Sequence, residues 1–282
     1  MATDQGTLFC GTELAERIER AEAELIAEAS AVSGARLGAA AGFVVPLAGG
    51  VASFAEDGSP LNKVAGLGFG GLPSAAELDV VEKLFAERGA PVQAEVCQLG
   101  DPAIAERLTE RGYRLVSFEN VLGLELDPAR TSITADGVEV THSRAEEFDS
   151  WVDVVVTGFA NPDGQGLAAH EEFPADIIAR ATRDMGAVAG ARRYLARHHG
   201  AVAGGASMRI TAGIAQLNGA ATHPEHRRHG VQSSLLSVRL AEASAAGCDL
   251  AVVITQPGSK SQQNVQRLGF ALLYTRAILV KP

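Results

Sequence analysis

A strand, a basic turn and a helix follow one another directly over residues 216–236, and this order constrains the fold more than any other part of the chain. The turn contains Arg227, Arg228 and Gly230, and apolar residues at helical spacing begin at Val231. The first amides of a helix have no partner within it and lie at the positive end of its dipole, so they favour an anion. Gly230 permits close approach of the backbone, and the two arginines add charge-assisted contacts. We therefore predict a phosphate-binding turn here.

The first half of the chain alternates helical and strand patterns. Apolar residues at three- and four-residue steps predict an amphipathic helix over residues 12–31. Ser74 and Glu77 have the spacing of a capping box, which predicts the start of a second helix over 74–88. A third helix begins at Asp101 and ends at Gly112. Short apolar stretches bounded by glycine predict strands over residues 42–54, 63–69 and 92–99, and a strand pair over 113–126.

Residues 127–132 combine proline with small polar side chains and interrupt both periodicities, which is typical of a linker. We place a domain boundary there, between residues 1–130 and 131–282. The second half has the predicted strands 138–142, 194–198, 201–210, 215–222, 250–255 and 270–280, and the predicted helices 145–159, 169–185, 231–246 and 261–268.

The two halves end alike, which indicates an internal duplication. Leu108-Thr109-Glu110-Arg111-Gly112-Tyr113 corresponds to Val265-Gln266-Arg267-Leu268-Gly269-Phe270, and a long apolar strand follows each segment. The first copy has no arginine–glycine turn. If both copies share one fold, only the second keeps the anion site.

The basic turn resembles the pyrophosphate loop of the GNAT superfamily of N-acyltransferases, which reads Arg or Gln, two residues, Gly, one residue, then Gly or Ala. Here the pattern falls on Arg227, Gly230 and Gln232, and the glutamine departs from it. A Pro224–Glu225 pair before the turn and Leu268-Gly269-Phe270 near the end extend the resemblance over about residues 133–282. The resemblance implies an α/β chain of the α+β type with two GNAT-like domains, the first degenerate. Each would be a mixed, largely antiparallel twisted sheet flanked by helices.

The resemblance also implies a co-substrate, acetyl-CoA or another acyl-CoA, and no metal. It would lie between the strand that ends near Thr222 and the strand that starts near Leu250. By this carry-over the main chain of Ala220, Ala221 and Thr222 holds the pantetheine and the acyl carbonyl, and Asn264 adds a pantetheine contact. The pyrophosphate would be held by Arg227, Arg228, His229, Gly230, Val231, Gln232 and Ser233. The alternative is a helix start with solvated arginines that binds nothing.

Acid and base candidates are few. An alkyl ammonium with a pKa of about 10.4 must lose a proton before it attacks, which costs about 4.6 kcal/mol at pH 7. In this family the acid is commonly a tyrosine, and Tyr274 is our candidate; the alternative is an interior strand tyrosine with a satisfied hydroxyl. His223 is the candidate base, although a histidine before proline is often only exposed. The strand itself offers Gln216 and Asn218 but no carboxylate.

The resemblance implies an N-acetyltransferase that acts on an amine, which we expect to belong to a small molecule, by direct attack in a ternary complex. The alternative from another class is a non-catalytic acyl-CoA-binding sensor. A protein acceptor, or different chemistry on an acyl-CoA, stays open. Asp163, Glu171 and Glu172 are candidates for holding a cationic acceptor, and the two glutamates equally fit a helix-start charge cluster.

Composition and charge narrow the remaining classes of partner, location and metal site. The net charge of −10 disfavours nucleic acid and acidic membranes as partners, and no apolar segment approaches the length of a membrane span, so we expect a cytoplasmic protein. The odd number of separated cysteines, Cys10, Cys97 and Cys248, favours reduced buried thiols. A metal site at His223, His226 and His229 is disfavoured because Pro224 prevents a one-face helical arrangement. The oligomeric state stays open.

Overall fold

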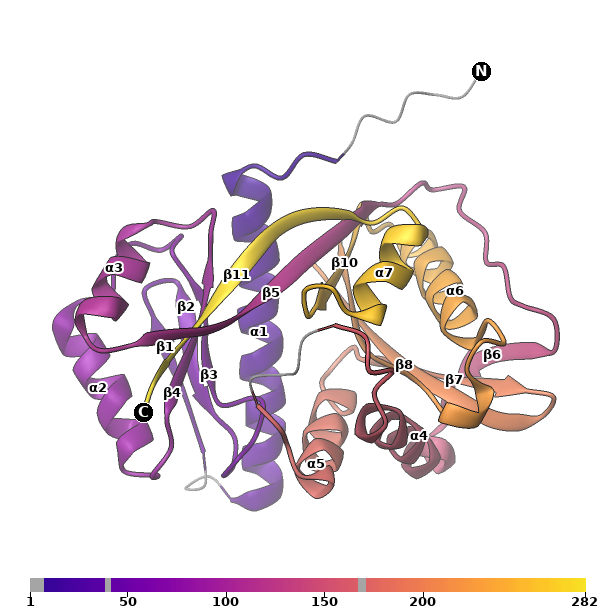
Figure 1. Cartoon of the computed structure of the whole chain (residues 1–282), viewed down its shortest axis with the longest axis horizontal. Coiled ribbons are helices and arrows are strands. Elements are labelled where there is room, and N and C mark those ends of the chain that lie inside the picture. Colours follow the sequence, from indigo (N-terminus) through magenta and orange to yellow (C-terminus); the bar gives the residue numbers. More distant parts are fainter. Residues whose placement is uncertain (1–7, 39–41, 167–170) are drawn as a thin grey trace.

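The structure is a computed structural model that describes residues 8–38, 42–166 and 171–282. Its strands form one eleven-stranded sheet in the order β1-β2-β3-β4-β11-β5-β10-β9-β8-β7-β6 (Figure 1). The strands are β1 (Phe43–Leu47), β2 (Gly50–Phe54), β3 (Lys63–Leu67), β4 (Val92–Cys97), β5 (Arg114–Glu125), β6 (Val138–His142), β7 (Arg192–His198), β8 (Ala201–Thr211), β9 (Ile214–Thr222), β10 (Leu250–Thr255) and β11 (Ala271–Lys281). The α-helices are α1 (Thr12–Leu37), α2 (Ala75–Ala86), α3 (Ala103–Glu110), α4 (Phe148–Ala160), α5 (Ala175–Gly186), α6 (Val231–Ala245) and α7 (Lys260–Arg267).

The sheet is mixed and largely antiparallel, so the predicted fold class is confirmed. Its two parallel pairs are β3 with β4 and β9 with β10. Along the chain, one helix lies between the two strands of each parallel pair: α2 between β3 and β4, and α6 between β9 and β10. This repeated order of elements agrees with the predicted internal duplication. No helix among the described residues is long and apolar enough to cross a membrane.

The last strands of the two halves are exchanged. β5, which ends the N-terminal half, pairs with β10 of the C-terminal half, whereas β11, which ends the chain, pairs with β4. β5 and β11 also pair with each other and cross the middle of the molecule together (Figure 1). The predicted strand pair over 113–126 is wrong: these residues form the single strand β5, since its whole length finds partners in β10 and β11.

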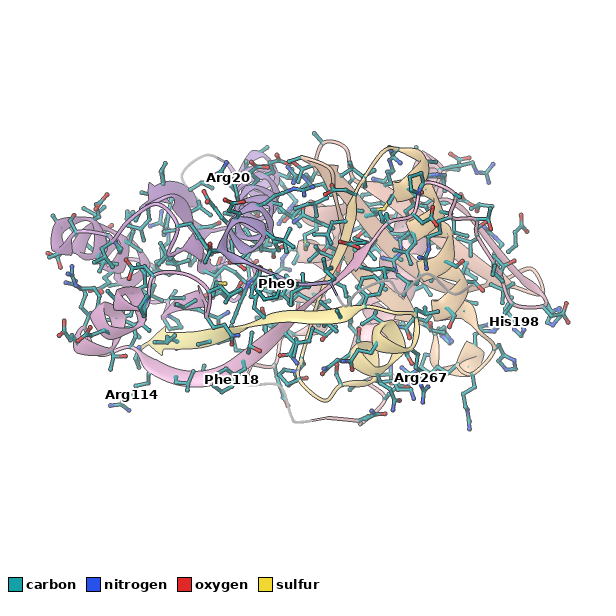
Figure 2. The ribbon with its side chains drawn as sticks, turned by 90° about the horizontal axis from the view of Figure 1, so that it is seen from above. Phe9, Arg20, Arg114, Phe118, His198 and Arg267 are labelled. Atoms are coloured by element: carbon teal, nitrogen blue, oxygen red, sulfur yellow. The ribbon has the colours of Figure 1, made fainter. Side chains whose placement is uncertain are left out.

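α1 and α6 cover opposite faces of the sheet. Successive side chains of a strand point to opposite faces, and on β9 and β10 the residues Ile214 and Val252 join the cluster of α1. Their neighbours Ala215 and Ala251 join the cluster of α6. Arg20 of α1 and Phe118, which is 46% exposed on β5, mark the two sides of the molecule in Figure 2.

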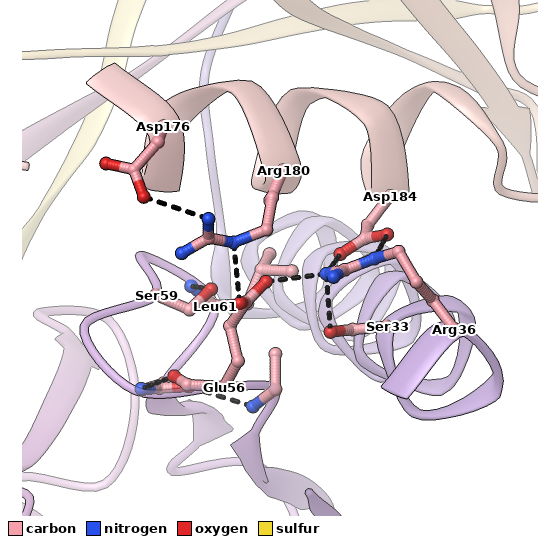
Figure 3. Close-up of polar contacts among 10 residues, drawn as sticks. Ser33, Arg36, Glu56, Ser59, Leu61, Asp176, Arg180 and Asp184 are labelled. Atoms are coloured by element: carbon pink, nitrogen blue, oxygen red, sulfur yellow. Dashed lines mark hydrogen bonds and ion pairs between the residues drawn. The ribbon is translucent and has the colours of Figure 1, made fainter. Parts of the chain in front are cut away.

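A polar network fastens α1 to α5 (Figure 3). Arg36 near the end of α1 donates to both carboxylate oxygens of Asp184 on α5, at 3.1 and 2.7 Å, and also to Glu56 in the loop after β2. Arg180 of α5 donates to the other oxygen of Glu56 at 2.7 Å. Because Asp184 is only 3% exposed, this contact is shielded from water and holds the two helices in register. α5 begins at Ala175, directly after Pro174, so residues 171–174 lie outside the helix predicted over 169–185.

Candidate functional site

β9 and β10 separate after a short parallel contact. They pair from Ile214 to Gln216 and from Leu250 to Val252, and beyond these residues they no longer pair with each other, although β9 continues to Thr222 beside β8 and β10 to Thr255 beside β5. β9 also bulges where it passes β8: Asn218 faces Ser207 and Ala221 faces Gly205, so Gly219 and Ala220 together oppose one residue. Gly219 has a φ of +58°, which a residue with a side chain rarely adopts. Bulges often re-aim a strand next to a site, and this one lies just beyond the point where β9 and β10 stop pairing.

The two separating strands end in polar groups that lack partners. Within the described part of the chain, the hydroxyls of Thr222 and Thr255 and the Nδ1 atom of His223 are buried and make no hydrogen bond. A buried polar group left unpaired costs about 1–3 kcal/mol. These atoms therefore fit a polar ligand between β9 and β10, which is where Ala220, Ala221 and Thr222 were predicted to hold pantetheine.

The basic turn leads into an uncapped helix. Arg228 and Gly230 have left-handed backbone conformations, with φ of +66° and +74°, and α6 begins at Val231. Among the described residues no side chain caps this helix, and its first turn contains no acidic residue. The amides of Val231, Gln232 and Ser233 are thus available to an anion, as the sequence predicts. Arg228 and His229 are exposed beside them.

The corresponding helix of the N-terminal half, α2, has a capped N-terminus. α2 starts with a capping box in which Ser74 accepts from the amide of Glu77, and Glu77 accepts from the amide of Ser74 at 2.8 Å. The hydrogen bonds from Ser74 lower the pKa of Glu77 below its ordinary value. A phosphate would have to displace this carboxylate, so the start of α2 is a poor anion site.

Arg227 contacts the loop after α4. Its guanidinium donates to the carbonyl oxygen of Asn161, and it lies 3.2 Å from the carboxylate of Asp163. The turn predicted to bind pyrophosphate is thereby joined to the loop predicted to bind the acceptor. Glu171 and Glu172, the other acceptor candidates, lie between that loop and α5.

Asn264 and Gln232, both predicted to contact the co-substrate, do meet. The Asn264 amide on α7 donates to the Gln232 side-chain oxygen on α6. The bond links the two helices that follow β9 and β10, so both residues flank the opening between these strands.

A histidine cluster lies beside the turn. The Nδ1 atoms of His198 and His226 are 3.4 Å apart, and the rings of His198 and His229 stack at 4.5 Å. Burial, together with its histidine neighbours, lowers the pKa of His198. No group of histidine, cysteine, aspartate or glutamate side chains in the described residues is arranged to hold a metal ion. His198, at the end of β7 (Figure 2), was missed from the sequence because it lies far along the chain from the turn.

Tyr274 lies apart from the turn, in the interior. It is 1% exposed on β11, and its hydroxyl donates to Glu19 of α1 at 2.7 Å. Arg276 donates to the same Glu19 oxygen at 2.7 Å. Burial raises the pKa of Tyr274 well above its usual value, and the neighbouring Glu19 adds to the rise. These contacts match the alternative of an interior strand tyrosine with a satisfied hydroxyl; a role as the acid stays a prediction.

Glu22 was also not identified as a site residue from the sequence. It lines a cavity of about 10 Å³ at the point where β9 and β10 separate, on the face that α1 covers. The other lining residues are Ile18, Ile214, Gln216, Asn218, Val252 and Ile254. A space of this size holds about one water molecule. Glu22 is thus a carboxylate, contributed by the N-terminal half, beside a strand of the C-terminal half that has none.

Solved structures with a similar fold include GCN5-related N-acetyltransferases. The chain is similar to one from Kribbella flavida, with a TM-score of 0.60 and 20% identity over 90% of this chain and 95% of that one. It is also similar to a tandem GNAT protein from the clavulanic acid biosynthesis pathway, with a TM-score of 0.58 and 17% identity over 96% of each chain. At these identities the likeness shows the fold, a tandem GNAT fold.

A sequence match gives the family of the C-terminal part of the chain. Residues 139–271 match the family described as "Acetyltransferase (GNAT) domain". This part of the chain is therefore a GNAT acetyltransferase domain, and the whole chain has a tandem GNAT fold. No curated protein matches it.

Proposed function

We propose that the protein is an acetyl-CoA-dependent N-acetyltransferase that acetylates an amine of a small molecule by direct attack in a ternary complex. The observation that carries this proposal is the uncapped start of α6. This helix follows the left-handed Gly230 and the strand β9, beyond the point where β9 separates from β10. A diphosphate fits such a helix start, because free amides and the helix dipole both favour an anion. When bound, acetyl-CoA supplies an acetyl group activated as a thioester.

Different residues around the opening between β9 and β10 would hold different parts of the co-substrate. Arg227, Arg228 and the amides of residues 231–233 would hold the pyrophosphate. The main chain of residues 220–222 and the unpaired Thr222 and Thr255 hydroxyls are suited to the amides of the pantetheine arm. Gln232 and Asn264 flank the same opening.

A sensor that binds acyl-CoA without turnover is the second candidate. The observation that favours it is the polar side chains of β9 at the cavity, Gln216 and Asn218, neither of which takes up a proton at neutral pH. Glu22 at the same cavity favours the enzyme instead.

Calorimetric titration with acetyl-CoA tests the proposal. The wild type should bind, and the Arg227→Ala, Arg228→Ala double variant should bind about tenfold more weakly for each arginine lost, since a hydrogen bond to a charged group contributes about 1.5–3 kcal/mol. The matched control, Arg20→Ala with Arg114→Ala, removes the same charge far from the turn and should bind as the wild type does (Figure 2). Failure of the wild type to bind would overturn the proposal.

A further inference from the structure

We propose that α1 of the N-terminal half forms the acceptor side of the site, and that Glu22 binds the ammonium group of a cationic primary amine and accepts its proton. The inference rests on the proposed acetyl transfer and names its acceptor class. It gives the N-terminal half a role: this half does not bind a second acetyl-CoA but completes the site of the other half.

Glu22 lies where an acyl group held between β9 and β10 would be open to attack. The cavity that it lines spans the end of the parallel pairing, from Ile214 to Asn218 on β9 and from Val252 to Ile254 on β10. α6, whose start carries the phosphate site, packs on the opposite face of these strands. A co-substrate that enters between the strands would thus meet α6 on one side and Glu22 on the other.

A chain of hydrogen bonds orients Glu22. Arg209, which is 6% exposed on β8, donates to Glu28 of α1 at 2.6 Å and to the Gln216 side-chain oxygen at 3.0 Å. That bond fixes the Gln216 amide, whose nitrogen then donates to Glu22 at 3.4 Å. Both ends of the chain lie on α1, so the helix holds the strand and the strand orients the carboxylate.

The surroundings of Glu22 are rich in carboxylates, of which Glu119 has a pKa raised to about 7. The carboxylates of Glu19, Glu22, Glu95 and Glu119, from α1, β4 and β5, gather around two cations, Lys63 of β3 and Arg276 of β11. A third cation, Arg209 of β8, lies beyond Gln216. Glu19 is 1% exposed, lies three residues before Glu22 on the same helix face, and has one oxygen without a partner in the described structure. A cation that enters the cavity would be attracted, whereas an acceptor with its own carboxylate would be repelled.

Burial raises the pKa of Glu22 above its ordinary value, and Arg276 opposes the rise. A carboxylate with a raised pKa accepts a proton more readily at neutral pH. The ammonium group loses two protons during the reaction. One goes to Glu22, which frees the lone pair for attack on the thioester carbonyl carbon. The C–N bond forms, the C–S bond breaks, and the second proton ends on the departing thiolate sulfur.

The position of α1 is fixed independently of the cavity. Arg36 joins it to Asp184 of α5, so the helix that carries Glu22 is fastened to the C-terminal half at its far end as well (Figure 3). The cavity of about 10 Å³ admits only one small group. It matches the size of an amino group better than that of a whole acceptor.

Turnover of acetyl-CoA with paired amines tests the inference. The panel contains spermidine, tyramine and the lysine side chain of a blocked peptide, with tyrosine as the carboxylated partner of tyramine, and release of the CoA thiol is measured. We expect tyramine to be preferred over tyrosine by at least about tenfold in kcat/KM. Glu22→Gln should lower kcat/KM about 100-fold and leave the Kd for acetyl-CoA within about twofold. The matched control is Glu13→Gln, an exposed carboxylate earlier on the same helix.

The pH profile separates a proton acceptor from a structural role. In the wild type kcat/KM should rise as Glu22 loses its proton, at a pH above the ordinary glutamate range, and Glu22→Gln should lack this limb. If the glutamine variant does not fold, Glu22→Asp decides, because it should keep the limb at lower kcat. Acetyl-CoA binding without acetylation of any amine in the panel would overturn the inference, as would unchanged turnover in Glu22→Gln. Absent acetyl-CoA binding would instead overturn the proposed function.

Discussion

The guanidinium of Arg227 lies 3.2 Å from the carboxylate of Asp163 and also donates to the carbonyl oxygen of Asn161. One arginine therefore joins the turn before α6 to the loop after α4. The same guanidinium is a proposed pyrophosphate ligand. Asp163 and the co-substrate would compete for it.

Replacing Asp163 by asparagine should strengthen acetyl-CoA binding. The pair is partly exposed, with Asp163 at 48%, and exposed pairs contribute about 0.2–1 kcal/mol. We expect the Kd for acetyl-CoA to fall about two- to fivefold in calorimetry at low salt. Asp153→Asn on the exposed side of α4 is the control and should leave the Kd unchanged. Weaker binding in Asp163→Asn would show that Asp163 orders the turn rather than competes with the ligand.

Gly230→Ala should disturb the turn more than strain alone explains. At φ of +74° a side chain is unfavourable, and a Cβ atom here would lie 2.5 Å from the Cβ of Ala135. Gly247, with φ of +79° and open space around it, is the matched control for strain. Urea unfolding should show a loss of about 1–3 kcal/mol for Gly247→Ala and a larger loss for Gly230→Ala. Only the second should weaken acetyl-CoA binding, and equal effects on binding would contradict the assigned role of the turn.

The turn and the cap of α2 could be predicted from sequence because both are local. Ser74 with Glu77, and Arg227 with Gly230, lie within one helical turn or one loop, where spacing determines contact. The same local rules cannot say which strand lies next to which. The pairing of β11 with β4 and of β5 with β10 depends on how two sheets meet, and a single strand pattern does not contain this information.

Glu22 could not be found from sequence for the same reason. It is one of several glutamates along an amphipathic helix, and its hydrogen bond to Gln216 spans 194 positions. Tyr274 shows the opposite case. Its place after Leu268-Gly269-Phe270 was read correctly as a strand, but only the packing of α1 against β11 reveals the bond from its hydroxyl to Glu19.

Tyr274→Phe should destabilise the fold. It would leave the Glu19 carboxylate, which is 1% exposed, without the hydroxyl, at a cost of about 1–3 kcal/mol. Tyr194→Phe is the matched comparison: it removes the same kind of bond, to Glu242, at 2.8 Å, and each carboxylate keeps an arginine partner, but Glu242 is 27% exposed. Urea unfolding should show the larger loss for Tyr274→Phe. If that variant instead keeps full stability and loses turnover at unchanged acetyl-CoA affinity, Tyr274 acts as the acid.

Stability should fall as the pH rises through the titration of Glu119. Burial and the neighbouring Glu95 raise the pKa of Glu119 to about 7, against an ordinary value near 4.5. Between these two pH values the folded state holds more protons than the unfolded state, so the free energy of unfolding decreases with pH and levels off above about 7. Below about 4.5 both states are protonated, and the stability from this group is fully present.

Glu119→Gln should therefore flatten the pH dependence. The variant cannot ionise, so its free energy of unfolding should drop less between pH 5 and pH 7.5 than that of the wild type, by on the order of 1–2 kcal/mol. A residual slope of the same sign should remain, because the pKa of Glu22 is raised as well. Glu125→Gln, an exposed position on the same strand, should retain the wild-type slope. Urea unfolding at the two pH values measures the difference, and equal slopes in Glu119→Gln and the wild type would show that Glu119 is already ionised throughout this range.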